Sequence, residues 1–228
     1  MQGNGDSSPS SAWLRSFLWR MYYLCVMEPI DTFLTIADKA EGLYTEKRSK
    51  FLAFALPVHT VDEIKVRLEA FQKEYYDARH ICYAYMLGAR RTEFRANDNG
   101  EPSGTAGKPI LGQINSLQLT DILVVVVRYF GGIKLGTGGL TVAYKAAAAE
   151  ALAAATIIEK TVDGEIAVHF EYPLMNDIMR IVKEEEPTIV AQSYENDCTM
   201  HLRIRLGKLD RLIERLSKVE TARIESIS

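Results

Sequence analysis

The chain has 228 residues, of which 47% are hydrophobic and 25% are charged, and its formal net charge is −3. This composition is typical of a globular protein with one or two ordinary cores. The negative balance excludes an overall basic field that attracts nucleic acid, so any site for a polyanion must be local.

The cysteines and the apolar segments indicate the cellular setting. The three cysteines form no CxxC pair and no zinc-ligand spacing, which favours a reducing cytoplasm over a disulfide framework. No segment approaches the ~18 consecutive apolar residues that a membrane-spanning helix needs. We therefore expect a cytoplasmic protein without a membrane span.

Residues 1–26 differ in composition from the rest of the chain. A polar start rich in Gly, Ser and Pro is followed by an aromatic segment that contains Trp13, Phe17 and Trp19. Its charges and small residues do not stand where a signal peptide needs them. We interpret this segment as an extension, disordered or from a mis-called start, with Met27 beginning the first domain. An amphipathic membrane-surface anchor is the alternative.

The next part of the chain predicts two strands, a helix and a third strand. Residues 43–45 and 51–56 indicate strands on either side of a turn. Thr60 and Glu63 form a capping-box signature that begins a helix. Residues 81–87 are aromatic and aliphatic, as in a strand buried on both faces. The helix carries one apolar stripe, which consists of Val61, Ile64, Leu68, Phe71 and Tyr75.

The middle of the chain predicts a helix, a central strand and a second helix. Pro109 stands where the first turn of a helix tolerates proline. Residues 122–127 are uninterruptedly apolar, as central strands covered on both faces are. Residues 139–155 are dominated by alanine, which predicts a helix by intrinsic propensity.

A second domain is predicted from Asp163 onward. Apolar and polar residues alternate over 166–170, which indicates a half-buried strand. The order β-α-β-β-α-β is that of a ferredoxin-like domain, so we divide the chain into 27–162 and 163–228. The remaining expected elements are helices over 174–185 and 209–216, and strands near 189–194, 199–206 and Arg223.

Two glycine-rich loops, each leading into a helix, predict the functional site. They cover residues 97–107 and 128–140, and each carries a cation. A helix start offers unpaired N–H groups and about half a positive charge, so it favours anions, and glycines let the backbone approach a ligand closely. Tyr129 and Phe130 add stacking surfaces of the kind that nucleic-acid sites use. The predicted anion and nucleic-acid site consists of Gly104, Thr105, Gly107, Lys108, Arg128, Tyr129, Phe130, Gly131, Gly132, Lys134, Gly136, Thr137 and Gly138.

Other interpretations of the loops stay open. Pro102 and Pro109 stand where a Walker A motif needs a glycine and a hydroxyl, and the second loop does not fit G-x-G-x-x-G. In the structural alternative the glycines serve only as turn residues, and Arg128 pairs with Asp98 or Glu101. We expect the two loops to bind an anion as well as to form turns, because each loop brings its own cation.

Catalysis and metal binding have little support in the sequence. The loop hydroxyls are not set in a G-x-S-x-G elbow. His80 is a candidate base, although a histidine at the start of a strand more often satisfies backbone groups. The other histidines form no metal-ligand spacing with the cysteines. We therefore expect no catalytic residue, no metal and no cofactor.

The predicted C-terminal sheet has an outward face with mixed charge. In a ferredoxin-like sheet the strand near 199–206 lies beside the first strand, so Arg203 or Arg205 is expected to pair with Glu165 or Glu171. The outward positions lack the exposed aromatics on which an RRM stacks bases. This pattern favours a protein-binding surface or a solvated sheet over an RNA platform.

The loop sequences carry a family resemblance. Residues 98–109 read DNGEPSGTAGKP, residues 126–140 read VVRYFGGIKLGTGGL, and DARH at 77–80 also matches. In this order they resemble the IMPACT/YigZ family, over roughly residue 32 to the C-terminus. The resemblance implies an α+β fold: an N-terminal βαβ domain like the second domain of ribosomal protein S5, and a C-terminal ferredoxin-like βαββαβ domain.

The resemblance also bears on function. Eukaryotic relatives act in translational control through an RWD domain that the resemblance does not include, so their kinase-related role is not carried over. We predict a non-catalytic, translation-associated regulatory protein that binds RNA or a ribosome-associated factor through the two loops. One alternative is an enzyme acting on a small phosphorylated metabolite or nucleotide, and another is a protein-interaction module that uses the C-terminal sheet. The sequence does not indicate an oligomeric state.

Overall fold

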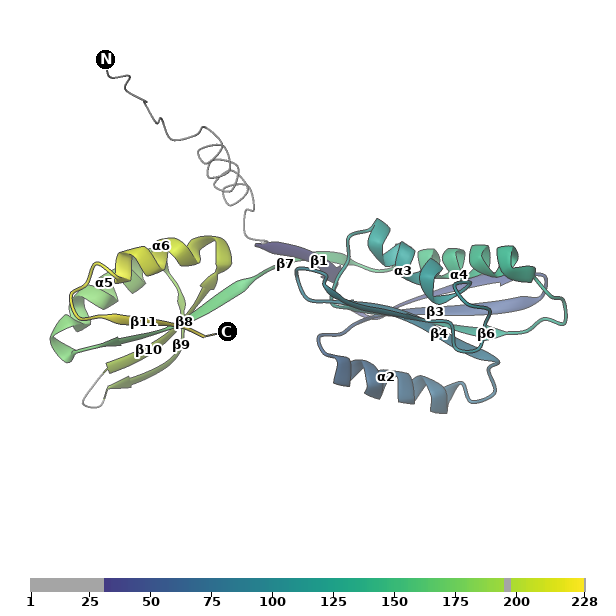
Figure 1. Cartoon of the computed structure of the whole chain (residues 1–228), viewed down its shortest axis with the longest axis horizontal. Helices are drawn as coiled ribbons and strands as arrows, with labels where there is room; N and C mark the ends of the chain where they lie inside the picture. Colours follow the sequence, from purple (N-terminus) through teal and green to yellow (C-terminus); the bar gives the residue numbers. More distant parts are fainter. Residues whose placement is uncertain (1–30, 195–197, 228) are drawn as a thin grey trace, which may run out of the picture. The chain divides into compact units, whose positions relative to one another are not determined.

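The computed structural model describes residues 31–194 and 198–227, which form two compact units (Figure 1). The N-terminal unit is Thr32–Val162, and the C-terminal unit contains Asp163 onward together with Asp31. The predicted extension, residues 1–26, lies outside the described residues. None of the described helices is long and apolar enough to cross a bilayer.

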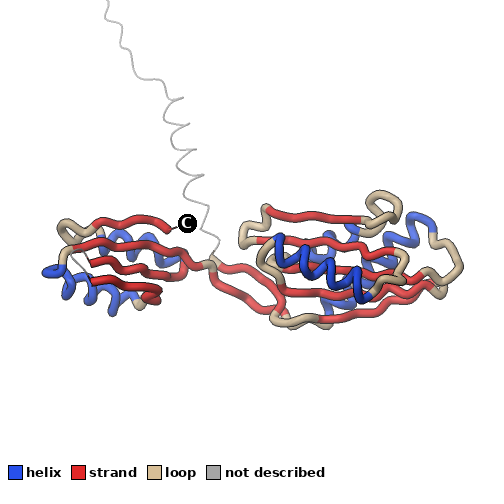
Figure 2. The backbone as a smooth tube through the Cα atoms, turned by 90° about the horizontal axis from the view of Figure 1, so that it is seen from below, coloured by secondary structure: helices blue, strands red, loops and turns tan. Residues whose placement is uncertain are grey.

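The N-terminal unit is built on a five-stranded antiparallel sheet with the order β2-β3-β6-β4-β5. One helix covers one face of this sheet and two cover the other (Figures 1 and 2). The α+β prediction is confirmed by this mixture of sheet and helices. The strands are β2 (Ala40–Glu46), β3 (Ser49–Pro57), β4 (His80–Leu87), β5 (Glu93–Asn97) and β6 (Ile122–Tyr129), and the helices are α2 (Val61–Glu74), α3 (Gly107–Ser116) and α4 (Gly136–Ala153).

The central position of β6 explains its unbroken apolar sequence. Its side chains alternate between two cores, because successive residues of a strand point to opposite faces. Val124 and Val126 pack with α3 and α4, whereas Leu123, Val125 and Val127 pack on the α2 side. Every one of these residues is fully buried, as the sequence pattern predicted for a strand covered on both faces.

The N-cap at Thr60 is confirmed. The Glu63 N–H donates to Thr60 Oγ1 at 3.1 Å, and the His59 N–H donates to Glu63 Oε2 at 3.0 Å. The first bond satisfies a donor that a helix start leaves without an intrahelical partner, and the second ties the Glu63 side chain to the residue before the N-cap. Ile64 and Phe71 from the apolar stripe are buried against the sheet.

Three strands of the N-terminal unit were not predicted. They are β1 (Thr32–Ile36), β5 (Glu93–Asn97) and β7 (Ile157–Thr161). β1 and β7 form a separate two-stranded antiparallel sheet, in which Thr32 pairs with Thr161. β5 is an edge strand with exposed or half-buried side chains, so it lacks the apolar pattern by which buried strands are found.

The C-terminal unit has the predicted ferredoxin-like order. Its sheet order β11-β8-β10-β9 and the two helices between its strands give βαββαβ. Both helices lie on one face, and no helix among the described residues covers the other face (Figure 2). Arg203 pairs with Glu165 as predicted, whereas Arg205 pairs with Asp31. The elements are β8 (Asp163–Phe170), a short 3-10 turn (Tyr172–Leu174), α5 (Met175–Glu185), β9 (Thr188–Tyr194), β10 (Cys198–Arg205), α6 (Leu206–Leu216) and β11 (Arg223–Ile227).

Candidate functional site

Both glycine loops contribute to one groove in the N-terminal unit, which we call the loop groove. It has a volume of about 540 Å³ and lies beside the start of α4. Of the predicted site, Arg128, Phe130, Lys134, Gly136 and Thr137 line it. The full lining set is Arg79, His80, Glu101, Pro102, Arg128, Phe130, Lys134, Leu135, Gly136, Thr137 and Leu140.

The start of α3 is not open to an external anion, which corrects one expectation. The Asp98 carboxylate accepts N–H donors from Gly104 at 2.8 Å, Ala106 at 2.9 Å and Gly107 at 2.8 Å. Burial alone would raise the pKa of Asp98, but these donors and the charge of Lys108 outweigh it and hold the pKa below the ordinary value. The chain therefore supplies its own anion at this helix start.

The remaining predicted residues of the first loop have structural roles or face solvent. Thr105 Oγ1 donates to the Pro102 carbonyl at 2.7 Å and is buried. A Cβ at Gly107 would lie 2.5 Å from the Asn97 nitrogen, so glycine permits the close approach of α3 to β5. Lys108 is exposed and does not line the loop groove.

The second loop presents an open helix start. Among the described residues no side chain caps α4, and its first turn contains no acidic residue. Lys134 precedes this helix start and is exposed. Because the N-terminal amides and this cation stand together without a carboxylate in the helix's own first turn, the start of α4 suits an anion.

The glycines of the second loop differ in what they do. Gly131 approaches the β2–β3 turn so closely that a Cβ would lie 2.1 Å from the Arg48 carbonyl carbon. Gly132 and Gly136 have φ of +86° and +72°, a region that favours glycine. Gly138 has neither constraint, since a Cβ placed there would meet nothing within 4 Å and its φ is not positive. Its missing side chain leaves space at the start of α4.

The floor of the loop groove is a buried polar cluster. Arg128 Nη1 lies 2.5 Å from Glu101 Oε1, and the Tyr144 hydroxyl donates to the same oxygen at 2.9 Å. The Cys82 thiol lies behind them, 2.9 Å from the Asp98 carbonyl and 3.3 Å from the Tyr144 hydroxyl. Burial raises the pKa of Cys82 to about 12 and raises the pKa of Tyr144 as well, so both are protonated at neutral pH.

This cluster decides between the two interpretations of Arg128. The pairing with Glu101 is observed, so the guanidinium charge is largely neutralised and does not act as a free phosphate-binding cation. Its Cζ lies 5.7 Å from the Phe130 ring centroid and 5.5 Å from that of Phe51. Arg128 therefore supports the aromatic wall of the groove by cation–π contact.

His80 binds a backbone carbonyl, which is the more common role of a histidine at the start of a strand. Its Nδ1 lies 2.9 Å from the Asn99 carbonyl oxygen, which can only accept, so Nδ1 carries the proton. In the neutral ring Nε2 then holds the lone pair, 3.9 Å from Glu101 Oε1.

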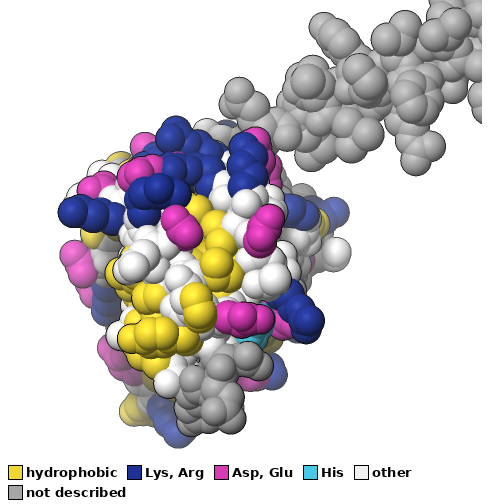
Figure 3. All heavy atoms as spheres, turned by 90° about the vertical axis from the view of Figure 1, so that its left-hand side faces the viewer, with side chains coloured by type: hydrophobic (Ala, Val, Ile, Leu, Met, Phe, Trp, Pro, Cys, Tyr) yellow, Lys and Arg dark blue, Asp and Glu magenta, His cyan; other side chains and the backbone are white. Residues whose placement is uncertain are grey.

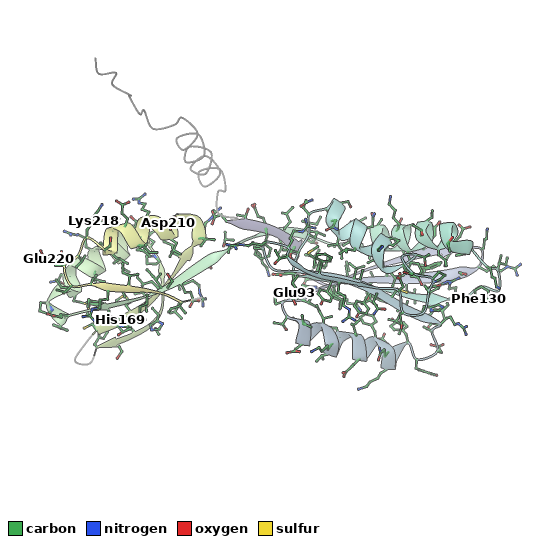
Figure 4. All side chains as sticks on the ribbon, viewed as in Figure 1. Glu93, Phe130, His169, Asp210, Lys218 and Glu220 are labelled. Atoms are coloured by element: carbon green, nitrogen blue, oxygen red, sulfur yellow. The ribbon has the colours of Figure 1, made fainter. Side chains whose placement is uncertain are left out.

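The two adjacent aromatic residues of the second loop separate. Phe130, labelled in Figure 4 beyond the end of β6, is 50% exposed and lines the loop groove. Tyr129 is half-buried and its hydroxyl donates to Asp77 at 2.9 Å. Of the two residues predicted to stack a base, Phe130 presents its ring to the groove.

A second hollow, of about 510 Å³, lies on the helical side of the C-terminal unit. Its cations are paired within the unit: Arg215 with Glu185, Arg180 with Asp177, and Lys218 with a neighbouring glutamate. The end-on face in Figure 3 likewise shows hydrophobic side chains among both cations and carboxylates. Within the described ranges, no group of three or more His, Cys, Asp and Glu side chains could hold a metal ion.

Sequence reasoning did not assign Asp98 and Tyr144 to the site. Asp98 acts six to nine residues ahead of the amides that it binds, a spacing outside the usual capping motifs. Tyr144 lies in the alanine-rich helix, where a fully buried tyrosine needs a polar partner for its hydroxyl. This need for a buried polar partner is the sequence signal that could have placed Tyr144 in the site.

The comparisons with known proteins by sequence all point to one family. The Impact N-terminal domain pattern matches residues 47–152, which include the whole loop groove. "IMPACT family member YvyE" of Bacillus subtilis (strain 168) is 32% identical over 157 residues, covering 69% of this chain and 72% of that protein. "IMPACT family member YigZ" of Escherichia coli (strain K12) is 36% identical over 151 residues, covering 65% and 74%. A crystal structure of a hypothetical protein matches with a TM-score of 0.67 and 30% identity, over 87% of this chain and 98% of that one.

Proposed function

The chain belongs to the IMPACT family, and on this premise we propose that it is a translation-associated regulatory protein that binds RNA through the loop groove. The observation that supports the proposal is the combination at the start of α4. An uncapped helix start, the cation Lys134 and the half-exposed ring of Phe130 line one groove. Backbone amides suit a phosphate, and an aromatic face suits a base.

In this proposal the phosphate binds on the second loop alone. The α3 amides are occupied by Asp98 and Lys108 stands outside the groove, so they are not part of the contact. Lys134 and the amides of Gly136, Thr137 and Gly138 receive the phosphate oxygens. Gly138 is exposed and has no steric or backbone reason to be glycine, which is consistent with a ligand approaching the main chain there.

The net charge of −3 shapes what kind of binding is expected. Without an overall basic field, few phosphates are contacted at once. We therefore expect modest affinity for single-stranded RNA and a shallow dependence on salt, since each phosphate contact on a single strand contributes about −0.7 to the log–log slope.

The test compares Lys134→Ala with the unaltered full chain. Binding to an unstructured single-stranded RNA is measured by fluorescence anisotropy between about 50 and 200 mM salt. We expect weaker binding and a slope that becomes shallower by about 0.7–1. Lys73→Ala is the matched control, because it removes the same charge from an exposed position on α2, on the other face of the sheet. An unchanged slope in Lys134→Ala, or equal losses in both variants, contradicts the proposal.

The volume of the groove favours a second candidate function. About 540 Å³ falls within the range of small-molecule sites, roughly 300–1,000 Å³. The ligand in this case is a small phosphorylated metabolite or free nucleotide. A thermal-shift series with nucleotides and sugar phosphates distinguishes the two, because a small ligand that binds the folded state raises the melting temperature by mass action. Tight binding of a metabolite together with no binding of RNA supports this second candidate.

A further inference from the structure

Two buried groups in the floor of the loop groove retain unused hydrogen-bonding capacity. The side chains of Glu101 and Arg128 are 4% and 7% exposed. The Arg128 Nη1 group and the Tyr144 hydroxyl both donate to Glu101 Oε1. A carboxylate has about four acceptor sites and a guanidinium has five N–H donors, so both groups have hydrogen-bonding capacity beyond these two contacts.

Both side chains are reached from the groove, because Glu101 and Arg128 line it. The floor thus offers an anionic acceptor beside a cationic donor.

The walls above this floor are apolar and fit a flat ring. Phe130 is half exposed and lies beside the Arg128 guanidinium. Pro102, Leu135 and Leu140 also line the groove. A base that stacks on Phe130 presents its hydrogen-bonding edge to the polar floor, and its phosphate is left for the helix start of α4.

We propose that the base read in this groove is an unpaired guanine. Its Watson–Crick edge carries the acceptor O6 next to two N–H donors, at N1 and the 2-amino group. Arg128 Nη2 donates to O6, and Glu101 Oε2, an acceptor with two lone pairs, receives both N–H groups. Guanine therefore makes three bonds. Adenine offers its amino group and the acceptor N1, and cytosine offers its amino group and the acceptors N3 and O2. Each has a single N–H donor group for the carboxylate and makes two bonds with these atoms.

The same contacts require a single strand. The edge that Glu101 and Arg128 bind is the edge that a complementary base uses in a duplex, so a paired guanine cannot enter. A groove of about 540 Å³ takes one nucleotide rather than a helix. Recognition of splayed-out bases through their edges and faces is the usual mode for single-stranded RNA.

The inference rests on the proposed function, and its test separates the two. The full chain is titrated with three eight-nucleotide RNAs of adenosine that carry guanosine, inosine or adenosine at one central position. Inosine lacks only the 2-amino group. We expect the guanosine RNA to bind about tenfold more tightly than the inosine RNA, which is the effect of one hydrogen bond to a charged group. When both RNAs are annealed to complementary strands, we expect this difference in affinity to disappear.

A variant of Glu101 tests whether the preference for guanosine arises at the floor of the loop groove. In Glu101→Gln we expect guanosine and inosine RNAs to bind alike, because the anionic acceptor is gone, and circular dichroism checks that the variant folds. The comparison of guanosine with inosine on the unaltered chain does not depend on that variant. Equal affinity for all three RNAs, or equal affinity for single-stranded and annealed RNA, overturns the guanine inference but leaves the RNA proposal in place if Lys134→Ala still weakens binding. No binding of any of these RNAs overturns both.

Discussion

Asp98 provides the sharpest test of how the groove is held in shape. Its carboxylate accepts three backbone N–H groups at the start of α3. A hydrogen bond to a charged acceptor contributes about 1.5–3 kcal/mol, so three bonds at the low end contribute about 4.5 kcal/mol. Asp98→Ala removes all of them. Asp98→Asn keeps an oxygen for Ala106 and Gly107 but turns an amide toward the Gly104 N–H, and we expect a loss of about 2.5 kcal/mol.

The assay reports on α3 locally, because the two units need not unfold together. Hydrogen exchange is followed in peptides that cover residues 104–116, with urea unfolding alongside it. Asp38→Ala is the matched control, since Asp38 is exposed in the turn before β2 and its loss is expected to cost less than about 0.5 kcal/mol. If both Asp98 variants lose less than about 1 kcal/mol, the three bonds do not stabilise this helix start and the reasoning fails.

Asp98 also predicts a dependence on pH. Its pKa is lowered in the folded chain, so its contribution is fully present above the ordinary pKa of an aspartate and is lost as the pH falls through the folded value. The stability difference between the unaltered chain and Asp98→Asn is therefore constant above about pH 5 and shrinks in more acidic solution. A difference that grows on acidification contradicts the lowered pKa.

Further predictions concern the pair in the floor and the glycines of the second loop. Arg128→Ala leaves Glu101 buried without its cationic partner, and urea unfolding is expected to show a loss of about 3–5 kcal/mol; a loss below about 1 kcal/mol contradicts the buried pairing. Gly131→Ala forces a Cβ against the Arg48 backbone and is expected to destabilise the N-terminal unit by about 1–3 kcal/mol. Gly138→Ala has open space and is expected to leave stability unchanged or raise it by up to about 1 kcal/mol while weakening RNA binding; unchanged affinity argues against phosphate at the start of α4.

Several elements found from the sequence show their burial in their residues. The unbroken apolar run of β6 and the stripe of α2 predicted elements that the structure contains, and the cap at Thr60 marked the start of α2 to the residue. β5 was missed because an exposed edge strand needs no apolar pattern. β1 and β7 pair with each other across more than a hundred residues, and such long-range pairing leaves no local signal.

The candidate site was predicted in part. The sequence indicated that the two loops contribute to one site, and residues from both line the loop groove. It did not show which helix start is open, because that depends on the folded position of Asp98. It also left the partner of Arg128 undecided between two carboxylates of the same loop, and only the three-dimensional path of residues 97–107 selects Glu101.

The pairing of β1 with β7 has a consequence for engineering. The chain enters the N-terminal unit at Thr32 and leaves it after Val162, and the register partner of Thr32 in the ribbon is the preceding residue, Thr161. A unit whose entry and exit are adjacent can be transplanted as a cassette into a host loop, or rejoined end to end with a new opening elsewhere. The ribbon thus makes residues 32–162 a transferable module whose host need supply only two neighbouring attachment points.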